Sequence, residues 1–114
     1  MSQPTQVKAN FEAVKTTTHA GAGAAYAALG TAFTTSPTAL IVSSSLDETV
    51  WLSTDGTNDM ILVPSGICFT INFGSNRQSG GFLTLPKGTQ LYIKQGPDGA
   101  SSTGDIGVTA VYGS

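Results

Sequence analysis

The chain has 114 residues, of which 11% are charged, and its formal net charge at pH 7 is −2. This length is sufficient for one domain, and the charged share is about half of that in an average globular protein. A nucleic-acid-binding protein needs clustered cations to neutralise phosphates, so the scattered cations of this chain argue against that class. Such a neutral, polar composition suits a subunit that packs against others. The five cations are Lys8, Lys15, Arg77, Lys87 and Lys94.

No segment approaches the ~20 consecutive apolar residues that a membrane span needs. The first residues, Met1–Pro4, lack the basic and apolar regions of a signal peptide. We therefore expect synthesis in a cytoplasm without export by a signal of its own. Cys68 is the single cysteine, which rules out an internal disulfide, and its apolar neighbours predict a buried or half-buried strand position.

The first 23 residues differ from the rest and predict an N-terminal arm, followed by a β-domain at 24–114. In the arm, Val7, Phe11 and Val14 are at helical spacing, which favours one or two amphipathic turns. A helix that short is not stable alone in water, so it must borrow apolar surface. We therefore expect these three side chains to anchor the arm on the domain or on a neighbouring subunit.

From residue 24 onward, short apolar runs alternate with turn residues about every ten positions. The clearest run is 67–73, where the odd positions are large and apolar and the even positions are small or polar. Seven or eight such strands predict an all-β, antiparallel β-sandwich, jelly-roll-like in type. The predicted strands are residues 25–29, 39–45, 50–53, 60–63, 67–73, 82–85, 90–94 and 106–112.

Residues 55–59 alternate oxygen-bearing side chains and could suggest a calcium loop. A calcium loop of the helix–loop–helix kind needs a bidentate glutamate at its twelfth position, which here is Gly66. The pattern instead favours a hairpin turn, in which Asp55 accepts hydrogen bonds from local backbone and Gly56 adopts a positive φ. We therefore expect no metal at this position.

Catalytic chemistry has little support in the sequence. His19 is the single histidine and has no neighbouring cysteine or carboxylate. No Gly-x-Ser-x-Gly motif occurs, and from Asp47 to Asp98 the acidic residues fall in predicted turns. An enzyme is therefore the least favoured class, and we expect no catalytic residue and no cofactor.

Trp51 is a candidate contact for a glycan or for a protein partner. It alternates with Val50 and Leu52, so it could face away from them, toward solvent or a partner. A position in the core or at its rim is the favoured interpretation for each aromatic residue. The tyrosines that could join it in one sugar-stacking platform are Tyr26, Tyr92 and Tyr112.

The stretch 40–112 combines an aliphatic strand, a strand ending in serine, an Asp-Gly turn and a Pro-x-Gly turn. These are followed by a Pro-Lys-Gly-Thr-Gln segment that leads into an aromatic strand. A glycine turn and a strand ending near a tyrosine come last. In this order the elements resemble a family of small tailed-bacteriophage virion proteins. The resemblance implies a non-enzymatic part of a virion, and it supplies no catalytic residue. The matching segments are Leu40-Ile41-Val42, Val50-Trp51-Leu52-Ser53, Asp55-Gly56, Pro64-Ser65-Gly66, Leu85-Pro86-Lys87-Gly88-Thr89-Gln90-Leu91-Tyr92-Ile93-Lys94, Ser102-Thr103-Gly104 and Val108-Thr109-Ala110-Val111-Tyr112.

The leading hypothesis is a virion structural protein that decorates or cements a capsid shell, assembled in a bacterial cytoplasm. Its partners would be the major capsid protein or other virion proteins and further copies of itself, with no nucleic acid and no membrane. Deletion of residues 1–20 is expected to leave a folded domain that no longer stays on the shell. A head–tail connector or fibre adaptor in the neck or tail is the first alternative. A carbohydrate-binding module displayed on the virion is the second.

Overall fold

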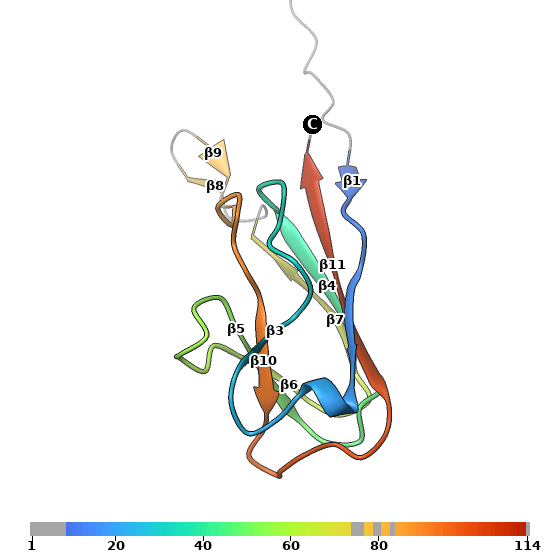
Figure 1. Cartoon of the computed structure of the whole chain (residues 1–114). Helices are drawn as coiled ribbons and strands as arrows, with labels where there is room; N and C mark the ends of the chain where they lie inside the picture. The colour runs from blue at the N-terminus through green and yellow to red at the C-terminus, as the bar shows by residue number, and fades with distance from the viewer. Residues whose placement is uncertain (1–8, 74–76, 79–80, 83, 114) are drawn as a thin grey trace, which may run out of the picture.

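In the computed structural model, described for residues 9–73, 77–78, 81–82 and 84–113, two antiparallel sheets pack face to face. Figure 1 shows the two layers, and the expected all-β sandwich is confirmed. The five-stranded sheet contains β1 (Ala9–Phe11), β2 (Lys15–Thr18), β4 (Ala39–Ser44), β7 (Cys68–Asn72) and β11 (Asp105–Gly113). The four-stranded sheet contains β3 (Ala27–Ala28), β5 (Val50–Ser53), β6 (Ile61–Val63) and β10 (Tyr92–Gln95). A separate hairpin pairs β8 (Arg77–Gln78) with β9 (Gly81–Phe82), and η1 (His19–Gly21) is a short 3₁₀ turn.

The order of the strands is that of a jelly roll. One sheet reads β2-β11-β4-β7 and the other β3-β10-β5-β6, with β1 continuing the edge that β2 forms on β11. From β2 to β11, and without counting the β8–β9 hairpin, each strand lies in the other sheet from the strand before it. The one exception is the step from β5 to β6, which are neighbours in the same sheet. Eight strands wound in this way form two Greek keys, which is the double-sheet jelly-roll architecture.

The hydrophobic core lies between the sheets and is built by alternation along each strand. In β5, Val50 and Leu52 are fully buried, and Trp51 points to the other side. In β11, Ile106 and Val108 are buried in the same manner. Each such side chain contributes about 1.5–3 kcal/mol when it leaves water, so these residues hold the sheets together. The core cluster consists of Ala22, Leu29, Phe33, Leu40, Val42, Leu46, Val50, Leu52, Val63, Leu91, Ile93, Ile106, Val108 and Ala110.

The described part of the predicted arm, residues 9–23, is integrated into the sheet. Phe11 pairs in register with Val111, and Lys15 pairs with Val108, so β1 and β2 form one interrupted edge strand on β11. The expected helical turns were therefore wrong for Phe11 and Val14. The reason is physical: β11 presents a long open edge whose backbone groups need partners, and a segment of three to four residues gains more by pairing there than by an isolated helical turn.

One prediction for the strand 67–73 needs correction at Cys68. Its side chain is exposed, because Cys68 stands opposite Ser43 on the outer side of β7 while Phe69 turns inward. The apolar neighbours that suggested burial belong to the opposite face of the same strand. Phe69, Ile71 and Phe73 pack against the core as expected but stay partly exposed.

Glu12 lies between β1 and β2 and fastens this edge to the loop between β3 and β4. Its Oε1 accepts hydrogen bonds from the backbone N–H and the hydroxyl of Thr34, both at 3.2 Å. Its Oε2 accepts from the backbone N–H of Thr35 at 3.2 Å and from the Thr35 hydroxyl. Burial raises the pKa of the Glu12 carboxyl, but the hydrogen bonds from Thr35 and Thr34 together outweigh it and hold the pKa below its ordinary value of 4.5.

Glu12→Gln is expected to lower the free energy of unfolding by about 1 kcal/mol at neutral pH, because an amide cannot accept all four hydrogen bonds and the site is partly open to water. Since folding lowers this pKa, the contribution is complete above the unfolded-state value of 4.5 and is lost as the pH falls through the folded-state value. Urea unfolding of both proteins from about pH 7 to about pH 3 measures it. The difference should shrink below about pH 4; a difference that stays constant would contradict the proposed role of the carboxylate.

Candidate interaction surfaces

The outer face of the five-stranded sheet is almost free of charge. Its side chains alternate with buried ones such as Val42 and Val108, so their direction follows from the strand register. Among the described outward positions only Asp105, at one end of β11, is charged. We call this surface the neutral face. Its residues are Phe11, Val14, Thr16, Ile41, Ser43, Cys68, Thr70, Gly107, Thr109 and Val111.

Two of the three predicted anchors lie on the neutral face. Phe11 is 62% exposed and Val14 is 55% exposed, which makes them the most exposed large apolar side chains among the described residues. Phe11 stands beside Val111, and Val14 lies over Gly107, where an added Cβ would be 3.1 Å from Val14 Cγ2. Val7 lies outside the described residues. The anchors are therefore positioned by strand pairing and not by a helix, and neither has a place in the core.

The outer face of the four-stranded sheet carries the tryptophan. Trp51 is half-buried, and its register partners are Lys94 of β10 on one side and Leu62 of β6 on the other. Directly opposite residues in neighbouring strands point to the same side of a sheet. Tyr92 is the next outward position of β10, and Tyr26 lies against Lys94 just before β3. We call this surface the aromatic face and define it by these five residues. Trp51 therefore lies on the outer side of the sheet and stays half-buried, so it is not a core residue.

A polar network stands beside Trp51 on the aromatic face. Asp59 Oδ1 accepts a hydrogen bond from the Tyr26 hydroxyl at 2.6 Å and forms an ion pair with Lys94 Nζ at 2.9 Å. The Lys94 ammonium also lies 4.7 Å from the centre of the Tyr26 ring, within cation–π range. Hydrogen bonds from Lys94 and Tyr26 lower the pKa of the Asp59 carboxyl, and burial together with Asp59 raises the pKa of the Tyr26 hydroxyl. At neutral pH the carboxylate is therefore ionised and the phenol keeps its proton.

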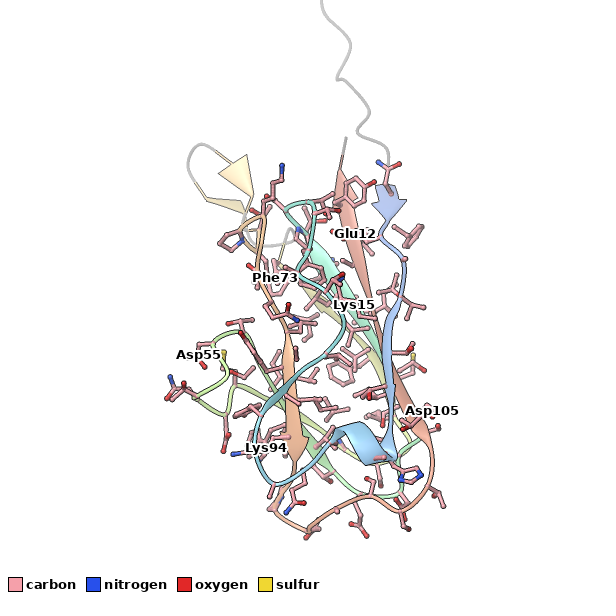
Figure 2. All side chains as sticks on the ribbon, viewed as in Figure 1. Glu12, Lys15, Asp55, Phe73, Lys94 and Asp105 are labelled. Atoms are coloured by element: carbon pink, nitrogen blue, oxygen red, sulfur yellow. The ribbon has the colours of Figure 1, made fainter. Side chains whose placement is uncertain are left out.

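The β5–β6 hairpin stands next to this network and is rigidly built. Asp55 Oδ1 accepts hydrogen bonds from the backbone N–H groups of Thr57 and Asn58 at 2.8 and 2.9 Å, and Gly56 has a φ of +73°. These backbone bonds hold the pKa of the Asp55 carboxyl far below its usual range. An added Cβ at Gly56 would meet the Tyr92 ring at 3.3 Å, so the turn lies against that ring. The predicted turn is confirmed, and Figure 2 shows Asp55 at the tip of a loop that projects from the sandwich.

The remaining candidate residues do not join either surface. His19 is half-buried, and its backbone N–H donates to the carbonyl of Gly104 at 3.0 Å. Tyr112 lies in β11, on the other sheet from Trp51, so it cannot join a sugar-stacking platform with Trp51. The two other tyrosines that were candidates for that platform, Tyr26 and Tyr92, lie on the aromatic face with Trp51. Within the described ranges, no group of three or more His, Cys, Asp or Glu side chains could hold a metal ion. A shallow hollow is lined by Thr16, Thr17, Thr18 and Asp105.

Lys15 was not anticipated as a buried residue. Its side chain enters the space between the sheets, where Nζ lies 5.0 Å from the centre of the Phe33 ring and donates to Thr31 Oγ1 at 3.4 Å. Gly30 packs so closely against it that an added Cβ would be 2.9 Å from Lys15 Cβ. Lys15 is buried because it pairs with Val108, an inward position of β11. This pairing joins distant parts of the chain, so the sequence alone did not indicate the burial.

The chain was compared with protein-family models, with curated proteins and with solved structures, and no match was found. The resemblance to phage virion proteins therefore stays a prediction from the sequence. No described segment forms a helix with the length and apolar character of a membrane span. We therefore infer the function from the fold and from the two surfaces.

Proposed function

We propose that the protein is a non-enzymatic bacteriophage virion structural protein that decorates or cements the capsid shell. The neutral face docks on the shell, and Phe11 and Val14 are its principal contacts. The major capsid protein is the partner, and neighbouring copies of the chain repeat the same contact across the shell. Assembly takes place in the bacterial cytoplasm.

The observation that carries this proposal is the exposure of Phe11 and Val14 on a sheet face whose described outward positions carry one charged residue, Asp105 at one end. When a partner covers an apolar aromatic side chain that is more than half exposed, the free energy falls by about 25 cal/mol per Å² of apolar area removed from water. The centre of this face has no charged group, so a partner can cover it without the cost of desolvating an ion, which is large for a group left without a partner. Jelly rolls build viral capsid and lectin domains, and this likeness is one of architecture alone.

The extent of the neutral face favours a contact that is repeated many times. β1 and β2 share one edge, so the face is four strands wide. Four strands spaced by about 4.8 Å, with roughly six residues of 3.3 Å each, give an area of about 400 Å². Stable pairs of proteins bury about 800 Å² on each partner. The neutral face alone is therefore better suited to an array, in which many weak contacts act together, than to an isolated complex.

A neck or tail position is the alternative, since the same surface could join copies in a closed ring. The two positions differ in the number of copies, because a shell offers hundreds of sites and a ring about a dozen or fewer. The test is the number of copies per purified virion, measured by quantitative mass spectrometry against the major capsid protein. A number near a simple fraction of the capsid protein supports decoration, and absence from virions overturns the proposal.

A further inference from the structure

The aromatic face combines an apolar aromatic surface with an ion pair that has spare hydrogen-bonding capacity. Its position does not depend on the neutral face, because the two lie on the outer sides of opposite sheets. Figure 2 shows Lys94 on the side of the molecule away from Asp105, which marks one end of the neutral face. A protein attached through the neutral face would thus present the aromatic face to its surroundings.

The ion pair is accessible and only partly satisfied within the protein. Both contacts of the Asp59 carboxylate reach Oδ1, and no described residue donates a hydrogen bond to Oδ2. The Lys94 ammonium has three N–H donors and directs one of them to Asp59. The Asp59 side chain is 39% exposed and that of Lys94 is 25% exposed. A ligand therefore meets one strong acceptor and further donors that are already held in place.

The hydroxyl groups of a sugar match this arrangement of donors and acceptor. A hydroxyl donates one hydrogen bond and accepts others, so adjacent hydroxyls can donate to Asp59 Oδ2 and accept from Lys94. The C–H groups of a pyranose ring form an apolar surface that packs on an aromatic ring. Trp51 is the register neighbour of Lys94 and lies on the same side of the sheet.

The supporting residues reduce the cost of ordering such a site. The Tyr26 hydroxyl and the Lys94 ammonium fix Asp59, and the hydrogen bonds to Asp55 fix the hairpin on which Asp59 is carried. A ligand that meets groups already in position loses less of its binding free energy to ordering. The opposite charges of the pair also favour a neutral ligand over an ionic one.

We propose that the aromatic face binds a neutral pyranose sugar, which stacks on Trp51 and places adjacent hydroxyls on Asp59 Oδ2 and the Lys94 ammonium. The ligand class is therefore a glycan that ends in an uncharged hexose or N-acetylhexosamine. This inference goes beyond the proposed attachment to a shell and does not rest on it, because the isolated protein is sufficient for its test.

Trp51 is the single tryptophan of the chain, so its fluorescence reports directly on this site. We would titrate the isolated protein with the methyl glycosides of glucose, galactose, mannose and N-acetylglucosamine, each to about 50 mM. A saturable change in emission with at least one of them, with a Kd of about 1–10 mM, is expected for a small ligand on an open site. The lack of a saturable change with all four would overturn the proposal.

Asp59→Asn keeps an oxygen for Tyr26 and Lys94, replaces the open acceptor by an N–H₂ donor and leaves the fluorescent reporter intact. It is expected to weaken binding at least fivefold. In Trp51→Ala, saturation-transfer NMR with the bound glycoside should lose its signal. Phe11→Asp combined with Val14→Asp is the matched control on the neutral face, and it should keep the wild-type Kd. Unchanged affinity in Asp59→Asn, with the fold verified by circular dichroism, would contradict the assigned role of the ion pair.

Discussion

Gly104→Ala is expected to lower the free energy of unfolding by about 3–5 kcal/mol, a large part of the stability of a domain this size. Gly104 lies in the loop that leads into β11 and has a φ of +93°, where residues with a side chain are strained. An added Cβ would also stand 2.0 Å from the carbonyl oxygen of Ser45. Backbone must move to relieve this contact, and the hydrogen bond from the backbone N–H of Ser45 to the carbonyl of Asp105 lies in the same region.

Gly99→Ala is the matched control for this substitution. Gly99 has a similar φ of +97°, but nothing lies within 4 Å of an added Cβ. Gly99→Ala should therefore lower the free energy of unfolding only by the cost of a positive φ for alanine, about 1–2 kcal/mol. Urea unfolding monitored by circular dichroism separates the two effects. Equal losses in both variants would show that the close approach of Gly104 to Ser45 does not contribute.

Phe11→Asp combined with Val14→Asp is expected to abolish most of the proposed attachment to the shell, with at least a tenfold loss of affinity. Both side chains are more than half exposed, so their replacement leaves no cavity and should change the stability of the isolated domain by at most about 1 kcal/mol. In a docked complex, however, each new carboxylate would be desolvated without a partner. Co-sedimentation of the purified protein with shells measures the effect.

The control places the same charges on the other sheet. Met60→Asp combined with Leu62→Asp changes side chains that are 46% and 45% exposed and lie on or beside the aromatic face. This variant should bind the shell as the wild type does. The pair of point substitutions is also cleaner than deletion of residues 1–20, which would remove β1 and β2 and uncover the edge of β11. Retained binding of the Phe11 and Val14 variant would contradict the proposed docking face.

Most strands of the sandwich from β4 onward could be predicted because their signals are local, whereas the predicted strand 82–85 belongs to neither main sheet. The alternation of Val50, Trp51 and Leu52 predicted both the strand and the direction of its side chains, and β5 has the expected bounds. The turn at Asp55 and Gly56 was predictable for the same reason, since its hydrogen bonds join residues two or three positions apart. Turns of this kind and the alternation of side chains along a strand can therefore be predicted from a single sequence.

The pairing of β1 and β2 with β11 was not predictable, because β11 lies far from them in the sequence. Phe11 and Val14 are three residues apart, a spacing that fits a helix, but here they reach one sheet face from either side of an interruption at Glu12. Glu12 itself receives its partners from Thr34 and Thr35, whose proximity follows from the tertiary fold. Local pattern could not decide between the two structures.

The candidate sugar site was predictable only in part. The sequence offered Trp51 as a candidate contact, but the network beside it joins Tyr26, Asp59 and Lys94 from three separate segments. Asp59 reads in the sequence as one more turn residue. Its role as an accessible acceptor appears only when the hairpin is placed next to β10.

The number of copies per purified virion, relative to the major capsid protein, separates decoration of the shell from a position in the neck or tail. We expect a ratio that is a simple fraction of the number of capsid-protein copies, with hundreds of copies per particle, because the neutral face is suited to a contact repeated over a symmetric surface. About a dozen copies or fewer would contradict decoration and place the protein in a ring at the neck or tail. Its absence from purified virions would contradict the virion function altogether.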